Sequence, residues 1–310
     1  TMMHRPLRRE FSNVALRALL LLPIAAATAA SAAGKATVDL TDPVTQLEAY
    51  VRVVGDTSGK PYTAYAEGTV YAVVPGAKAR PVFGVRVLGR GRFEKIDGGY
   101  QRLSREIGFY TDLKTGEILA TWYNPYMERE VEVVPIQNDP VNRKFIAGQG
   151  TPIRQMIAGD NVIFYREIPL RYPNPLDREN YPLYSSGDFY EAVELFNDYA
   201  NMRDLANPKL SSVPSTGSWS RIGPWLPWME MGQHEGHLLY HARAVKPING
   251  LNGVPAKLRE HIAKTAPKFL EAPSGIEGPD ETSWTVFKQR LEERGRAPRK
   301  TIPKEPARPE

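Results

Sequence analysis

The chain of 310 residues contains no cysteine, and its formal net charge of +5 comes from 40 Lys and Arg against 35 Asp and Glu. The positive charge lies at the ends: residues 1–33 contribute +3 and residues 294–310 contribute +4, which leaves −2 for the residues between them. A body of that charge argues against nucleic-acid binding, and zero cysteine excludes thiol catalysis, iron–sulfur clusters and thiolate zinc sites.

The N-terminal segment has the pattern of a signal peptide. A basic head is followed by an apolar stretch over residues 14–27 and by small residues around Ala32 that offer a cleavage site. We therefore expect residues 1–33 to be removed and the protein to be periplasmic or otherwise exported. The alternative is a membrane anchor, but the apolar stretch is shorter than the roughly 20 residues of a spanning helix. Arg8-Arg9-Glu10-Phe11 resembles a twin-arginine signal, and the sequence leaves open whether that route or general secretion is used.

The next long region reads as consecutive strands, rich in Val, Ile, Tyr and Phe and interrupted by turn residues. The clearest hairpin turns at Asp112-Leu113-Lys114-Thr115-Gly116, where the glycine can supply a left-handed residue. The expected strands cover Tyr62 to Val74, Pro81 to Ile96, Tyr100 to Tyr110, Glu117 to Tyr123, Glu130 to Val134, Val162 to Leu170 and His237 to Val245.

These strands predict a mostly β fold with a few helices. Seven or eight strands with short connections must either close or pack as two sheets, because open edges invite aggregation. In residues 100–110 neither face is purely apolar, since Arg105 lies on one face and Arg102 and Glu106 on the other. We expect an antiparallel meander closed into a barrel with an internal ligand cavity, as a single domain over residues 34–290. A two-sheet sandwich with one solvated face is the alternative.

Two helices and a tail complete the expected organisation. Apolar residues at helical spacing predict a helix over residues 189–206, and Asp188 with Glu191 has the pattern of a capping box. A weaker pattern predicts a second helix from Ala256 to Thr265. Residues 291–310 are largely charged and proline-rich, so we expect a disordered tail.

His234, His237 and His241 are the most metal-like group in the sequence. On a strand, His237 and His241 share a face but lie four residues apart, which is too far for one ion without a bend. We therefore assign no metal site. His241 remains a candidate proton carrier, with a hydrogen-bonded structural histidine as the alternative.

The segment from Trp219 to Gly232 is unusually rich in tryptophan and methionine and is braced by prolines. It predicts either a core plug at one end of the barrel or the aromatic wall of a pocket, because indoles and thioethers suit a planar apolar ligand. Within it, Arg221 could anchor a carboxylate, carbonyl or phenolate oxygen.

Several short stretches together resemble a bacterial domain-of-unknown-function family, the one numbered eighteen thirty-eight. They are Trp122-Tyr123-Asn124-Pro125, residues 135–142, Arg221 to Met231, Tyr240-His241 and residues 281–284. The resemblance spans roughly Val38 to Lys288 and implies no established reaction. The matching residues are Trp122, Asn124, Asn138, Asp139, Arg221, Trp225, Met229, His241 and Trp284, whereas His234 and His237 do not match.

Two functions from different classes fit this inventory. The first is a cofactor-free lyase or isomerase that acts by general acid–base chemistry on a bulky aromatic or polycyclic molecule, for example a lignin-derived phenolic dimer that loses formaldehyde. Its expected catalytic residues are His241, Asp139, Tyr123 and Arg221. Its expected ligand-binding residues are Arg105, Trp122, Asn138, Arg166, Trp225, Trp228 and Met229.

The second function is a non-catalytic periplasmic carrier of aromatic or other hydrophobic small molecules. In both cases the expected partner is a small aromatic or hydrophobic molecule. We expect no cofactor, no nucleic acid and only transient membrane contact during export, and the sequence leaves a homodimer open.

Overall fold

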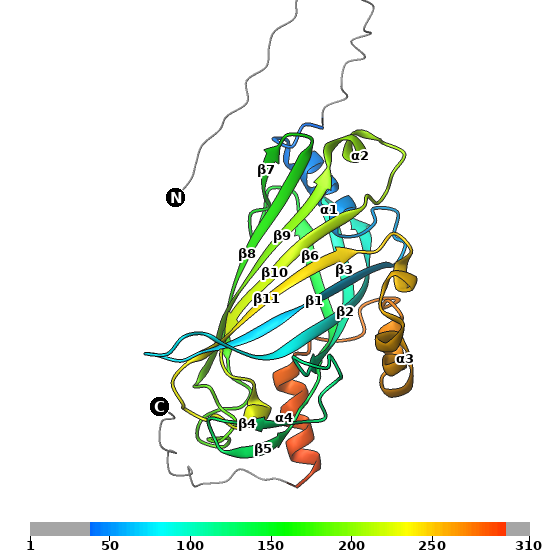
Figure 1. The fold of residues 1–310 in the computed structure, drawn as a ribbon. Helices are drawn as coiled ribbons and strands as arrows, with labels where there is room; N and C mark the ends of the chain where they lie inside the picture. Colours follow the sequence, from blue (N-terminus) through cyan, green and yellow to red (C-terminus); the bar gives the residue numbers. More distant parts are fainter. Residues whose placement is uncertain (1–37, 296–310) are drawn as a thin grey trace, which may run out of the picture. The chain divides into compact units, whose positions relative to one another are not determined.

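A curled antiparallel sheet is the main feature of residues 38–295, which the computed structural model describes and which belong to one compact unit. Its nine strands run in the order β6-β3-β2-β1-β11-β10-β9-β8-β7. The sheet curls strongly into a half-barrel that does not close, so β6 and β7 lie at its two edges (Figure 1). The expected signal peptide, residues 1–33, lies outside the described residues.

The elements have the following bounds. The strands of the large sheet are β1 Tyr62–Val73, β2 Arg80–Ile96, β3 Gly99–Thr111, β6 Ile136–Ile146, β7 Arg154–Ala158, β8 Asn161–Pro173, β9 Phe189–Asn201, β10 Ser215–Gly223 and β11 His237–Lys246. A separate two-stranded sheet contains β4 Thr121–Asn124 and β5 Arg129–Glu132. The α-helices are α1 Pro43–Val54, α2 Met202–Ala206, α3 Ala256–Thr265 and α4 Ser283–Glu293, and 3-10 turns cover Pro227–Met229, Gly250–Gly253 and Pro267–Leu270.

Helix α1 lies at one end of the half-barrel. Asp42 caps it by accepting a hydrogen bond from the Thr45 amide at 2.8 Å, and Pro43 occupies its first turn. Its apolar face, which includes Tyr50 and Val51, packs in a cluster of buried residues with Phe145 and other strand side chains. The cluster excludes water from this end of the concave face.

The opposite end is closed by the tryptophan-rich loop, the β4–β5 hairpin and α4 (Figure 1). Trp225 and Trp228 are buried there, and Trp228 contacts Phe83 and Tyr110 with ring centroids 5.6 and 5.3 Å apart. Asn124 is fully buried and donates to the Met229 carbonyl at 2.6 Å. The loop is therefore a core plug at this end of the half-barrel.

Helix α3 covers part of the convex face. Leu258 and Ile262 pack on Ile107 and Phe109 of β3, which point outward from the half-barrel. This helix was predicted correctly from Ala256 to Thr265. The strands expected from Tyr62 to Tyr110, from Val162 to Leu170 and from His237 to Val245 are also confirmed with small shifts at their ends. The strand expected from Glu117 to Tyr123 is shorter, because only Thr121–Asn124 is extended as β4, and β4 pairs with β5 and not with β3.

The helix expected over residues 189–206 was wrong. Phe189–Asn201 is strand β9, paired with β8 and β10, and only Met202–Ala206 is helical. Glu191 does not cap a helix but forms an ion pair with Arg171 across the β8–β9 ladder at 2.8 Å. Because β9 places charged side chains on the concave face, its apolar residues do not alternate cleanly, and a chance helical spacing dominated the sequence pattern.

Two other expectations need correction. The barrel does not close, because β6 and β7 at the two edges of the sheet do not pair with each other. The tail was placed too early: α4 continues to Glu293, and Leu291 is 3% exposed in the cluster at the plugged end. Residues 296–310 lie outside the described residues.

Leu291→Ala should lower the free energy of unfolding by about 2–4 kcal/mol, because it removes a buried side chain without replacing its packing. Glu293→Ala, two residues away and exposed, should change it by less than about 0.5 kcal/mol. Urea denaturation of both variants measures the difference. Equal stability of the two would mean that the end of α4 contributes nothing to the core.

Candidate functional site

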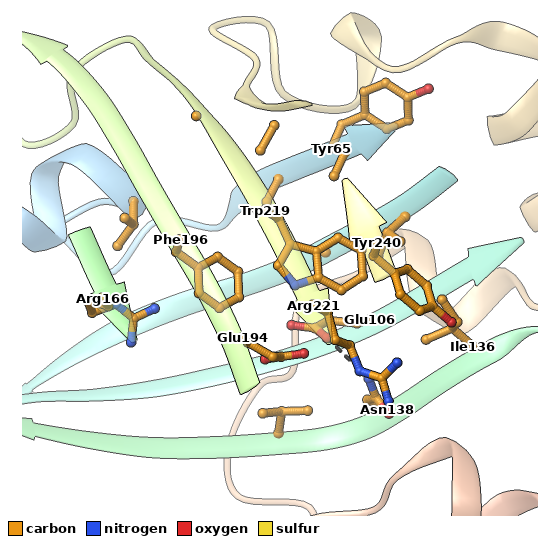
Figure 2. Close-up of a pocket in the computed structure, with 18 of the residues that line it drawn as sticks. Tyr65, Glu106, Ile136, Asn138, Arg166, Glu194, Phe196, Trp219, Arg221 and Tyr240 are labelled. Atoms are coloured by element: carbon orange, nitrogen blue, oxygen red, sulfur yellow. Dashed lines mark hydrogen bonds between the residues drawn. The ribbon is translucent and has the colours of Figure 1, made fainter. Parts of the chain in front are cut away.

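The concave face of the half-barrel contains a cavity of about 360 Å³ between the two apolar ends (Figure 2). Its aromatic lining consists of Tyr50, Tyr62, Tyr65, Tyr110, Tyr172, Tyr190, Phe196, Trp219, Tyr240 and Trp284. Its charged lining consists of Arg102, Glu106, Arg166, Glu194, Asp198, Arg221, Lys246, Asp280 and Glu281. The combination can surround an aromatic ring and contact polar groups attached to it.

Strand alternation explains which side chains reach the cavity. On β9, Glu194, Phe196 and Asp198 are spaced by two residues and all line it. The β9–β10 register places Arg221 directly opposite Glu194. Figure 2 shows Glu194 between Arg221 on one side and Arg166 on the other.

Arg221 is 6% exposed and is held among aromatic rings. Its Nη2 donates to the Tyr190 hydroxyl, and its guanidinium lies 5.0 Å from the centre of the Tyr240 ring and 5.6 Å from that of Trp284. Burial lowers the pKa of Arg221, but Tyr190, Tyr240 and Glu194 more than compensate and raise it. The guanidinium is therefore a permanent positive charge in the cavity.

Two carboxyl groups of β9 have raised pKa values. Burial raises the pKa of Glu194, against the opposing effect of Arg221. Burial likewise raises the pKa of Asp198 to about 6, although Arg166 and Lys246 oppose it. Both groups can therefore exchange a proton nearer to neutral pH than an ordinary carboxyl group can.

Tyr110 and Tyr240 form a buried pair with their hydroxyl oxygens 3.1 Å apart. Burial raises the pKa of each phenol. Both hydroxyls are therefore neutral at physiological pH. One of them must donate to the other, so the second hydroxyl hydrogen is free for another acceptor.

Lys246 supports α1 although it also lines the cavity. Its Nζ donates to the carbonyls of Arg52 and Gly55 at 2.6 and 2.9 Å and to the Ser212 hydroxyl at 2.8 Å. Burial lowers the pKa of Lys246 to about 7. The three acceptors match the three N–H groups of an ammonium ion, so this side chain holds the end of the helix in place.

Three of the sequence-predicted site residues line the cavity: Arg166, Arg221 and Asn138. Asn138 lies on β6 and donates to Glu106 on the neighbouring β3 at 3.3 Å. All three line the same cavity, and Glu106 lines it with them.

The expectation that His241 points into the cavity was wrong. On β11 its neighbour Tyr240 lines the cavity, so His241 faces outward and is exposed. Tyr123 is 60% exposed on β4 and does not line the cavity either. Neither side chain is in position to transfer a proton to a molecule in the cavity.

Arg105 and Asp139 belong to a buried ion cluster on the other face of β3. Arg105 Nε lies 3.1 Å from Asp139 Oδ1, and Lys268 Nζ lies 2.7 Å from Asp139 Oδ2. Arg105 also pairs with Glu277 at 2.5 Å. The cluster joins the segment after α3 to the sheet, so these residues act in the structure rather than in the cavity.

The four apolar site candidates also lie elsewhere. Trp122 packs against Phe83 and Trp228, whereas Trp225, Trp228 and Met229 are buried in the plug. The core alternative was therefore correct for this loop. Only Trp219 and Leu226 of the same segment, beside Arg221, line the cavity.

Sequence reasoning missed Glu194, Asp198, Arg102 and Glu106. The first two were hidden by the assignment of residues 189–206 to a helix. Arg102 and Glu106 had been recognised on the face opposite Arg105, but nothing in that strand alone indicated which face was concave. If β9 had been recognised as a strand, its alternation would have indicated that the two carboxyl groups share a face.

Two further findings concern metals and membranes. Across residues 38–295, no group of three or more His, Asp or Glu side chains has an arrangement suited to a metal ion. Among the helices of the same residues, none is both long and apolar enough to cross a membrane.

The architecture defines a mostly β half-barrel protein with an aromatic and charged cavity. The chain belongs to the family described as "Protein of unknown function (DUF1838)", whose match covers residues 59–291, from the loop before β1 into α4. This result confirms the resemblance found in the sequence. A search of curated proteins found no match.

Asp198→Asn tests the buried carboxyl group. Between about pH 4, the usual pKa of aspartate in an unfolded chain, and pH 6, the folded protein binds more protons at Asp198 than the unfolded chain does. The contribution of Asp198 to stability therefore decreases as the pH rises through this window. Relative to the wild type, Asp198→Asn should become more stable by about 2–3 kcal/mol between pH 4 and pH 7.5.

Urea denaturation at both pH values gives this difference. The control is Asp97→Asn, which removes a carboxyl group in the exposed β2–β3 turn, and the pH-dependent change for Asp198→Asn should exceed that of this control. A pH-independent difference for Asp198→Asn would contradict a raised pKa.

Proposed function

We propose that this protein is a cofactor-free lyase or isomerase that binds an aromatic small molecule in the cavity and acts on it by general acid–base chemistry. The observation that carries the proposal is the pairing of Glu194 with Arg221 on adjacent strands, inside a cavity with aromatic walls. A basic carboxylate opposite a fixed cation is the arrangement that proton abstraction next to a carbonyl requires.

Glu194 is the proposed proton carrier. A carboxylate with an ordinary pKa is a weak base at neutral pH, and its burial strengthens it. The same group can return the proton later in the reaction as an acid. It thus replaces His241 in the proposed mechanism.

Arg221 and the tyrosine pair are the proposed oxyanion stabilisers. Within the described residues, the bond to Tyr190 is the one hydrogen bond of the Arg221 side chain, so its other N–H groups remain for a ligand. The free hydroxyl hydrogen of the Tyr110 and Tyr240 pair is a further donor. Because these donors are held by packing, they need little reorganisation when charge develops.

One reaction of this class is loss of formaldehyde from a lignin-derived phenolic dimer with a hydroxymethyl group next to a ketone. Glu194 accepts the hydroxyl proton, the carbon–carbon bond to the hydroxymethyl carbon breaks, and formaldehyde leaves. The electron pair of that bond forms an enolate, whose oxygen faces Arg221. Glu194 then gives its proton to the enolate carbon, which completes the product ketone.

Glu194→Gln should reduce the turnover of such a dimer by about 10²–10⁴-fold, because the amide cannot accept the proton. Glu191→Gln removes an exposed carboxylate from the outer face of the same strand and should leave turnover unchanged. Formaldehyde and the ketone product, measured over time with each variant, give the rates. The wild-type rate should rise with pH as Glu194 loses its proton, and this rise should begin above the usual pKa of glutamate, about 4.3.

Stoichiometric binding of the dimers without product would contradict catalysis and favour the carrier function. Full activity of Glu194→Gln would remove Glu194 from the mechanism. In either case we propose that the protein works after export, as the pattern of residues 1–33 predicts.

A further inference from the structure

Three arginines gather in and beside the cavity, towards α1. Arg102 on β3 lies directly opposite Arg143 on β6 in the strand register. The guanidiniums of Arg143 and Arg166 lie 5.7 and 5.8 Å from the centre of the same ring, Phe145. Three positive charges therefore converge from three strands, β3, β6 and β8.

No carboxylate neutralises this group at close range. Among residues 38–295, none of the three arginines has an ion pair within 4.0 Å. Glu106, Glu194 and Asp198 lie close enough to act on them electrostatically but form no ion pair with them. Burial, together with the charges of Arg166 and Arg102, lowers the pKa of Arg143.

One buried donor of Arg166 and one of Arg102 are also unsatisfied. Arg166 is 6% exposed and lines the cavity, and its Nε has no hydrogen-bond acceptor among the described residues. The same is true of Arg102 Nε. Rings of Tyr50 and Phe196, 5.1 and 5.4 Å from the Arg166 guanidinium, support it from the sides but accept no N–H bond in these contacts. Such a group is costly in a free protein and becomes favourable when an anion binds.

We propose that Arg102, Arg143 and Arg166 bind the carboxylate of an aromatic acid. Guanidinium groups match a carboxylate through two parallel N–H bonds, and the buried Nε groups of Arg102 and Arg166 have no other acceptor among the described residues. The proposal rests on the function proposed above and adds the substrate class. With the carboxylate at the α1 end, the aromatic body extends past Phe196 towards Glu194 and Arg221 (Figure 2).

Matched probes test the charge directly. Isothermal titration calorimetry with 4-phenoxybenzoate and its neutral primary amide should show that the wild-type protein binds the acid more tightly. Arg102→Met and Arg166→Met should each weaken binding of the acid by about 10–100-fold, because each loses a charged hydrogen-bond donor. Binding of the amide should change by less than about 3-fold. The control is Arg171→Met. Arg171 is exposed and lies on β8, the strand that also carries Arg166, and its replacement should change the affinity for neither probe.

The thermal stability of the same variants separates a binding role from a structural one. Arg102→Met and Arg166→Met each remove a positive charge that acts against Arg143, so the melting temperature of the free protein should change little, whereas loss of a structural arginine should lower it. Arg166→Lys, which keeps the charge without the planar fork, should bind the acid with intermediate affinity.

Equal affinity for acid and amide, or affinity for the acid that survives Arg102→Met and Arg166→Met, would overturn the proposal. Failure of both probes to bind would overturn it as well. If the acid binds through the arginines but Glu194→Gln leaves turnover unchanged, the anion site stands and the proposed chemistry fails. The reverse result is turnover that depends on Glu194 together with equal binding of acid and amide. It would support the proposed chemistry and contradict the proposed carboxylate site.

Discussion

Charged side chains on the concave face of the sheet are the constraint on which the rest of the structure depends. Curling brings inward-facing residues of many strands together, and most half-barrels of this kind would fill that space with apolar side chains. Here Arg166, Arg221 and Glu194 project into it instead. Since buried charges need partners or water, the space between them cannot be packed like a core. The cavity follows from this requirement.

Stability must then come from the two ends and the outside of the sheet. At one end, Arg52 donates four hydrogen bonds to carbonyls of α2 and of the loop after it, which ties both to α1. At the other end, Asn124 donates a hydrogen bond to the Met229 carbonyl of the plug, and the side chains of Trp225 and Met229 fill the plug. Several residues that carry the family resemblance therefore serve the end plug, whereas Arg221 and Asn138 serve the cavity.

The sequence predicted β1, β2 and β3 well because their signals are local. The Asp97-Gly98 turn between β2 and β3 provides a left-handed glycine with φ 69°, and Gly116 does the same after β3 at φ 72°. The β9 segment follows Gly187-Asp188, where Asp188 has the pattern of a helix cap, and its inward side chains include Glu194 and Asp198. A strand whose inner face is polar loses the alternation by which strands are recognised, so the functional strand was the one that sequence reasoning misassigned.

The prediction of the site residues failed for a related reason. His241 and Tyr240 are adjacent on β11, and in a strand the choice between them is a choice of face. Chemistry favoured the histidine, but the pairing of Arg221 with Tyr240 across β10 and β11 sets the inward face. Composition cannot supply that register, because it depends on contacts between distant strands. When a strand has polar residues on both faces, its sequence shows which groups could do chemistry but not which face points into the cavity. That choice depends on how the strands pair. In this fold the inward face carries Glu194, Arg221 and Tyr240.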